Sequence, residues 1–174
     1  MSGQAAREGD PGVGLLALYD RTLPQVYGYL LSRSGDPAVA EDLTSETFFA
    51  AVDAVRREPP TAVSTPWLIG VARHKLVDHW RRRGREEQGL RGVSADAGVE
   101  DPWDVRLEVL TARATLARLG PHHRAALTLR YLDDLPVPEV AKLLDRTVHA
   151  TEALLVRART AFRRAYTEDE VDHA

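Results

Sequence analysis

Apolar residues recur along the chain at the three- and four-residue spacing of amphipathic helices, and no stretch shows the alternation of a half-buried strand. In the first helical run, over residues 13–33, the apolar positions are Leu16, Tyr19, Leu23, Tyr27 and Leu30. Gly35-Asp36-Pro37 follows, which combines a helix stop, a capping aspartate and a proline suited to the first turn. We expect the helix that begins here to reach about Arg57, because Glu58-Pro59-Pro60 would end it.

A second cap-and-proline signal, Thr65-Pro66, predicts the start of another helix, with Thr65 as its N-cap. The apolar stripe of this helix consists of Leu68, Val71, Ala72, Leu76 and Trp80. From about Gly84 the apolar period lapses into charged and small residues. We therefore expect a flexible linker over residues 85–103.

The helical period resumes beyond this linker, with apolar positions at Leu107, Leu110, Ala114 and Ala117. Gly120-Pro121 marks a stop and a restart, and the helix that follows is expected to continue to Leu132. A short helix over residues 137–144, a turn at 145–147 and a long helix to about Tyr166 then give the spacing of a helix-turn-helix. An ordinary helical hairpin would show the same spacing.

These patterns together predict an all-α protein with two small helical domains, residues 13–84 and 104–167, joined by the linker. With 44% hydrophobic residues in a chain of 174, the protein can bury a core. No run approaches the ~20 apolar residues of a membrane span, and the N-terminus carries no secretory signal. We expect a cytoplasmic protein with no membrane contact of its own.

The sequence contains no motif of a metal or catalytic site. Cysteine is absent, which excludes disulfides and thiolate ligands. The six histidines form neither HExxH nor another metal-ligand spacing, and no glycine-rich phosphate loop occurs. We therefore predict that the protein is not an enzyme and uses no metal or cofactor.

Positive charge is concentrated in one segment although the net charge is −3. Between residues 73 and 85 the cations are Arg73, Lys75, Arg81, Arg82, Arg83 and Arg85. The single acid there is Asp78, and Trp67, His74 and Trp80 lie in or beside the same segment. Cations that neutralise phosphates, next to flat side chains, are typical of surfaces that bind single-stranded DNA. The alternative is a solvated amphipathic helix in which Trp80 belongs to the core.

Three ordered motifs resemble the extracytoplasmic-function sigma factors, the smallest branch of the bacterial sigma superfamily, over roughly residues 13–166. AVAEDLTSETFFAAV at 38–52 resembles the family's conserved-region-two helix. TPWLIGVARHKLVDHWRRRGR at 65–85 resembles its tryptophan- and arginine-containing pattern for the minus-ten element. LARLGPHHRAALTLRYLDDLPVPEVAKLL at 116–144 resembles the start of region four. The resemblance implies a subunit that gives RNA polymerase its promoter specificity.

The resemblance also implies partners and site residues. The partners are core RNA polymerase, through its largest-subunit clamp and its flap, promoter DNA, and an anti-sigma factor. The residues implied to bind core polymerase are Asp42, Glu46 and Phe49. Those implied at the minus-ten element, where the loop before Trp67 captures a flipped base, are Trp67, Arg73, His74, Lys75, Asp78, Arg81 and Arg82. Those implied at the minus-thirty-five element are Arg124, Arg130, His149, Glu152, Ala153, Val156 and Arg157.

The last helix departs from the family pattern. Glu152 replaces a usual basic residue, Ala150 a usual threonine, Leu154 a usual arginine and Thr151 a usual valine. Pro136 takes the place of a hydroxyl N-cap. These changes predict that minus-thirty-five recognition is either weak or biased toward cytosine. Two other functions fit the residues alone. One is a helix-turn-helix regulator that binds duplex DNA without polymerase, and the other is a sigma-like interaction protein.

Overall fold

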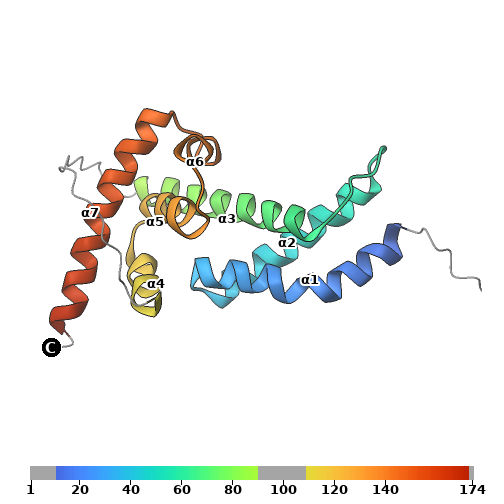
Figure 1. The fold of residues 1–174 in the computed structure, drawn as a ribbon, viewed down its shortest axis with the longest axis horizontal. Coiled ribbons are helices and arrows are strands. Elements are labelled where there is room, and N and C mark those ends of the chain that lie inside the picture. Colours follow the sequence, from blue (N-terminus) through green and yellow to red (C-terminus); the bar gives the residue numbers. More distant parts are fainter. Residues whose placement is uncertain (1–10, 90–108, 173–174) are drawn as a thin grey trace, which may run out of the picture. The chain divides into compact units, whose positions relative to one another are not determined.

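The computed structural model describes residues 11–89 and 109–172, and over that part of the chain it contains helices and loops but no strand, which confirms the all-α prediction (Figure 1). Its helices are α1 (Pro11–Ser34), α2 (Pro37–Arg56), α3 (Thr65–Gln88), α4 (Val109–Arg118), α5 (Pro121–Leu127), the π-helical turn η1 (Thr128–Leu132), α6 (Val137–Leu143) and α7 (Val148–Asp172). The chain divides into two compact units, residues 1–75 and 76–174. The boundary falls within α3, so this helix belongs to both units. No helix within the described residues is long and apolar enough to cross a bilayer.

In the first unit, α1 and α2 form a helical hairpin whose facing sides make the core. Gly35 ends α1 with a φ of 66°, a left-handed conformation that glycine adopts without strain. The Asp36 side chain then accepts hydrogen bonds from the backbone N–H of Ala38 at 2.9 Å and of Val39 at 3.4 Å. The predicted stop and cap are therefore confirmed. The Tyr19 and Phe48 rings, 4.7 Å apart, pack edge to face across the pair of helices.

The start of α3 differs from the sequence prediction by one residue. Ser64, not Thr65, is the N-cap, because its side-chain oxygen accepts a hydrogen bond from the Trp67 N–H at 3.3 Å. Thr65 is already the first helical residue. Both are hydroxyl residues directly before Pro66 or one position earlier, so the sequence alone could not choose between them. At its other end α3 continues through Gln88, four residues into the range predicted to be linker.

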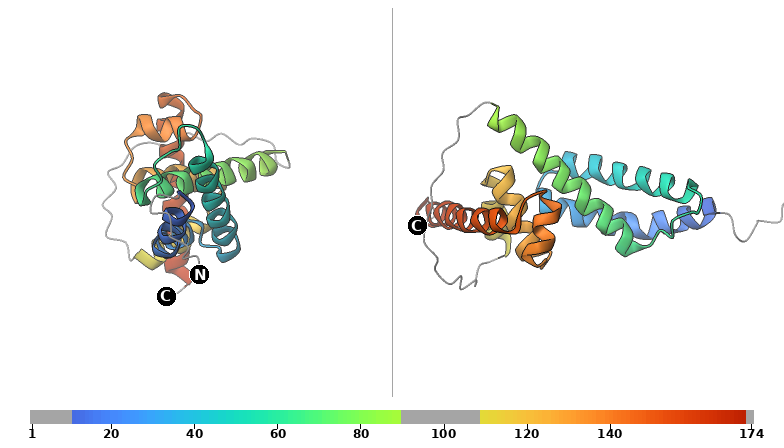
Figure 2. Two further views of the ribbon diagram at one scale, coloured as in Figure 1. Left: turned by 90° about the vertical axis from the view of Figure 1, so that its right-hand side faces the viewer. Right: turned by 90° about the horizontal axis from the view of Figure 1, so that it is seen from above.

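The helix-turn-helix consists of α6 and α7, and α7 packs against α4 and α5 as well as α6 (Figure 2). Val140 and Ala141 of the first helix and its C-cap Leu144 are buried. Asp145 forms the turn with a φ of 53°, a left-handed conformation that aspartate tolerates better than most residues. The Thr147 side chain then caps α7 by accepting from the Ala150 N–H at 3.1 Å.

The predicted inward face of α4 is wrong in part. Thr115 is fully buried, whereas Ala114 and Ala117, which the apolar period placed inward, are exposed. Burying a small alanine side chain contributes little free energy, so the spacing of Ala114 and Ala117 is a weak guide to the buried side of this helix. Leu107, predicted for the same stripe, lies outside the described residues, as does most of the predicted linker.

Candidate nucleic-acid and partner interface

One face of α2 carries the residues implied to bind core polymerase. Asp42, Glu46 and Phe49 stand four and three residues apart, which places them on one side of a helix. Asp42 is exposed, Glu46 is half-buried, and the Phe49 side chain is 71% exposed. Because Leu43, Thr47 and Phe48 are buried on the opposite side, the hairpin core fixes the direction of this acidic and aromatic face. An apolar ring left this exposed suits contact with another protein.

An ion pair joins this α2 face to α3 within the first unit. The Lys75 ammonium lies 3.3 Å from the Glu46 carboxylate, and their side chains are 35% and 43% exposed. The sequence motifs assigned Glu46 to polymerase and Lys75 to DNA, and nothing in the sequence predicted that they pair. Of the other minus-ten candidates in this unit, Trp67 and Arg73 are half-buried and His74 is exposed.

The second half of α3 presents arginines and buries its tryptophan. Trp80 is only 4% exposed, so it belongs to the core, as the alternative interpretation had it. Arg82 is exposed. Arg81 forms ion pairs with Asp78 at 3.5 Å and, within the second unit, with Asp145 at 3.2 Å. The carboxylate of Asp78 thus orients Arg81.

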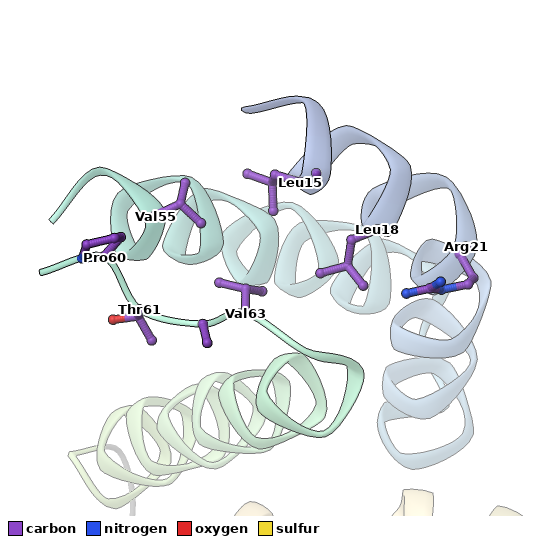
Figure 3. Close-up of a pocket in the computed structure, with 9 residues that line it drawn as sticks. Leu15, Leu18, Arg21, Val55, Pro60, Thr61 and Val63 are labelled. Carbon is purple, nitrogen blue, oxygen red and sulfur yellow. The ribbon is translucent and has the colours of Figure 1, made fainter. Parts of the chain in front are cut away.

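A cavity of about 510 Å³ lies between α1, the end of α2 and the loop before α3 (Figure 3). Its lining is mostly apolar, and Arg21 stands at one side as its single cation. The lining residues are Gly14, Leu15, Leu18, Arg21, Val55, Pro60, Thr61, Ala62 and Val63. Its volume falls in the ~300–1,000 Å³ range of small-ligand pockets, so it has room for a flat aromatic group such as a base.

The sequence indicated the loop of this cavity but not its other wall. Thr61 and Val63 follow the helix break that the two prolines predict. The other wall is formed by Leu15, Leu18 and Arg21, which lie outside the apolar stripe predicted for this helix and belong to no motif. Only the fold shows that the loop returns over this part of α1.

The recognition helix α7 exposes few groups that can read bases. His149 and Glu152 are exposed, and Ala153, Val156 and Arg157 are half-buried. Two of the departures from the family pattern are explained by packing: Leu154 is 4% exposed, and the fully buried Thr151 satisfies its hydroxyl by donating to the Thr147 carbonyl at 2.9 Å.

The cations near this helix are held by the protein itself. Arg130 lies 3.7 Å from the Asp134 carboxylate and donates to the Leu135 carbonyl at 3.4 Å. The Arg124 guanidinium lies 5.7 Å from the centre of the Trp80 ring. Sequence reasoning had assigned Arg124 and Arg130 to phosphates without foreseeing these intramolecular contacts.

Two histidines at the start of α5 have a lowered pKa. Burial is the main cause for both. The positive charge of Arg146 further lowers the pKa of His122, and that of Arg157 further lowers the pKa of His123. No group of three or more histidine and acidic side chains in the described residues could hold a metal ion.

Comparison with known proteins identifies the family that this chain matches. The sigma-70 region 2 model matches residues 18–86, and the sigma-70 region 4 model matches residues 110–162. BldN, an ECF RNA polymerase sigma factor of Streptomyces coelicolor, is 33% identical over 87% of this chain, which spans only 60% of BldN. SigM of Bacillus subtilis, also an ECF sigma factor, is 32% identical over 86% of this chain and 93% of SigM.

A solved structure shares the fold. The sigma factor RpoE from Bartonella quintana, in complex with the anti-sigma factor NepR, aligns with a TM-score of 0.52 at 20% identity, over 88% of this chain and 97% of RpoE. The resemblance seen in the three sequence motifs is thus confirmed by both region models and by relatives that match along most of the chain. The chain belongs to the extracytoplasmic-function family of RNA polymerase sigma factors.

Proposed function

We propose that this chain guides core RNA polymerase to promoters and assists strand opening, while the polymerase performs all nucleotidyl transfer in the cytoplasm. The observation that carries the proposal is the first unit, which combines an exposed acidic and aromatic face on α2 with cations on α3 and an apolar cavity. Run-off transcription with purified core polymerase, on DNA from upstream of the chain's own operon, tests it. Transcripts that depend on the added chain support the proposal, and their absence on every promoter tried contradicts it.

Core binding is assigned to Asp42, Glu46 and Phe49. Asp42→Lys combined with Phe49→Ala should abolish co-purification with core polymerase, because both side chains are exposed and neither contributes to the hairpin core. Glu41→Lys, which reverses an exposed acid on the same helix about 100° around the axis from Asp42, is the matched control. Unchanged helicity by circular dichroism would show that the double variant still folds. If the double variant still co-purifies normally with core polymerase, this face of α2 does not bind the polymerase.

The cavity beside the loop is proposed to receive the base that is flipped out of the minus-ten element. Flipping costs a few kcal/mol of unstacking, which an apolar pocket with a nearby cation can offset. Val63→Trp should fill the space from the loop side and weaken open-complex formation on duplex promoters. Core binding should persist, since Val63 lies away from the α2 face. A normal permanganate footprint with Val63→Trp would assign base capture elsewhere.

The helix-turn-helix is proposed to bind the minus-thirty-five element with little base reading of the ordinary kind. Arg124, Arg130 and Arg157 are the candidates for phosphate contacts, which position a protein without specifying sequence. The residues proposed to face the bases are His149, Glu152, Ala153 and Val156. Glu152 can accept a hydrogen bond from cytosine N4, and the apolar pair can contact a thymine methyl.

An anti-sigma factor is proposed as the third partner. RpoE was solved with such an inhibitor, and its fold is shared by this chain. The test is co-expression with candidate small proteins from the same operon, followed by run-off transcription with and without each one. A protein that both co-purifies with the chain and abolishes its transcripts would be the inhibitor.

A further inference from the structure

The ion pair between Glu46 and Lys75 connects two surfaces that the proposed function gives to different partners. The Lys75 nitrogen lies 3.3 Å from a Glu46 oxygen, and both side chains are more than a third exposed. At this exposure an ion pair has a small net free energy, since water and salt screen it. A partner that offers either charge a better contact can therefore break it.

The alternative contacts of each residue follow from its neighbours. Asp78 stands one turn beyond Lys75 but pairs with Arg81 at 3.5 Å, so Glu46 is the carboxylate that engages Lys75. Lysine carries a compact charge on a flexible four-carbon stem, which can turn from a carboxylate to a phosphate without moving the helix. Lys75 is the only lysine in a cationic segment otherwise built from arginines.

We propose that Glu46 is a positioning residue that holds Lys75 away from DNA in the free protein and releases it when polymerase engages the α2 face. The inference rests on the proposed function, in which Glu46 meets polymerase and Lys75 meets the minus-ten strand. Core binding then strengthens DNA binding. By linkage, DNA that captures Lys75 strengthens core binding by the same factor.

The free protein provides the first test, by fluorescence anisotropy with a labelled single-stranded oligonucleotide of mixed sequence at low salt. Phosphate contacts are independent of sequence, so this probe reports on Lys75. Glu46→Gln should raise affinity about two- to five-fold, the range expected when an exposed ion pair no longer competes. The gain should be absent when Lys75→Gln is also present.

A matched control separates the ion pair from general charge. Glu41 is an exposed acid on the same helix and forms no ion pair within the described residues. Glu41→Gln removes the same negative charge and should give clearly less than the Glu46→Gln gain. Equal gains from the two variants, or a Glu46→Gln gain that survives in the Lys75→Gln background, would overturn the inference.

The reconstituted holoenzyme provides the second test. Lys75→Gln should lower affinity for the same oligonucleotide about two- to five-fold more in the holoenzyme than in the free protein, because core binding has released Lys75. An equal loss in both states refutes release by polymerase but leaves the DNA-binding role of Lys75 supported. No loss in either state contradicts both this inference and the assignment of Lys75 to the minus-ten surface.

Discussion

Single residues at the helix ends fix the hairpin of the first unit. Gly35 allows the chain to leave α1 in a left-handed conformation, and Asp36 satisfies two backbone N–H groups of α2 that have no partner within the helix. The hairpin in turn sets which side of α2 faces outward. A local capping bond therefore affects the surface that is proposed to bind polymerase.

Asp36→Ala should lower the free energy of unfolding by about 1 kcal/mol, the usual cost of losing a side-chain N-cap. Urea denaturation followed by circular dichroism measures this loss. Asp53→Ala removes an exposed acid from the last turn of the same helix, far from the N-cap, and should not destabilise the protein. A loss of equal size in both variants would mean that charge, and not capping, is responsible.

Glu152 is the residue on which the specificity of the recognition helix depends. Its carboxylate is exposed and repels phosphates, so Glu152→Lys should raise affinity for duplex DNA in general and flatten sequence preference. Arg157→Ala should instead weaken binding about equally across sequences. Selection from a randomised promoter library measures both effects. A sharp minus-thirty-five consensus that Glu152→Lys leaves unchanged would contradict this role for the helix.

At the scale of elements, sequence periodicity predicted the helices well where they are long and amphipathic. It located α1, α2 and the helix-turn-helix. The stripe predicted for α1 was wrong in part, because Leu16 and Tyr19 are exposed and Leu18 and Val26 are buried instead. It placed the buried face of α4 wrongly, since alanine burial contributes little and Thr115 carries no apolar signal. The Glu46–Lys75 pair and the cavity over α1 could not be predicted either, since both depend on which helices meet.

The start of α5 gives the protein a dependence of stability on pH. The folded-state pKa values of His122 and His123 lie below their ordinary value of 6.5, mainly because burial disfavours the charged ring. The unfolded chain therefore binds more protons than the folded one near and below that pH. The stability that these groups contribute is complete above 6.5 and is lost as the pH falls below it.

His123→Gln should flatten the fall in unfolding free energy as the pH drops below 6.5. Denaturation curves at a series of pH values provide the measurement. His149→Gln, which replaces an exposed histidine on α7, should leave the dependence as it is in the parent protein. If His123→Gln shows an unaltered dependence, other groups must cause the acid destabilisation.

At the scale of the whole molecule, the net charge is −3, and several of the cations proposed to contact DNA are already paired with carboxylates. Lys75, Arg81 and Arg130 each lie within 4 Å of an acid, as the distances of 3.3, 3.5 and 3.7 Å show. DNA must compete with these internal partners. Weak binding by the free protein and a strong dependence on salt are the expected consequences.

Arg82 is exposed on α3, and Arg82→Ala should reduce the slope of log affinity against log salt for single-stranded DNA by about 0.7, as for one lost phosphate contact. Titrations of anisotropy at several salt concentrations give the slope. Arg56→Ala, at the end of α2 and outside the proposed DNA surface, serves as the comparison and should leave the slope unchanged. An unchanged slope with Arg82→Ala would exclude this guanidinium from the phosphate contacts.

The wide turn η1 affects the direction in which the chain continues into the helix-turn-helix. The Asp133 N–H donates to the Thr128 carbonyl at 3.0 Å, so the turn spans one residue more than an α-helical turn. A single extra residue moves the point at which the chain leaves this helix by about 100° around the axis, since an α-helix has 3.6 residues per turn. Deleting one residue here would restore regular winding yet swing Tyr131 away from Arg159, whose guanidinium now donates to its hydroxyl at 3.3 Å. The wide turn thus sets the direction in which the chain leaves η1 toward the helix-turn-helix.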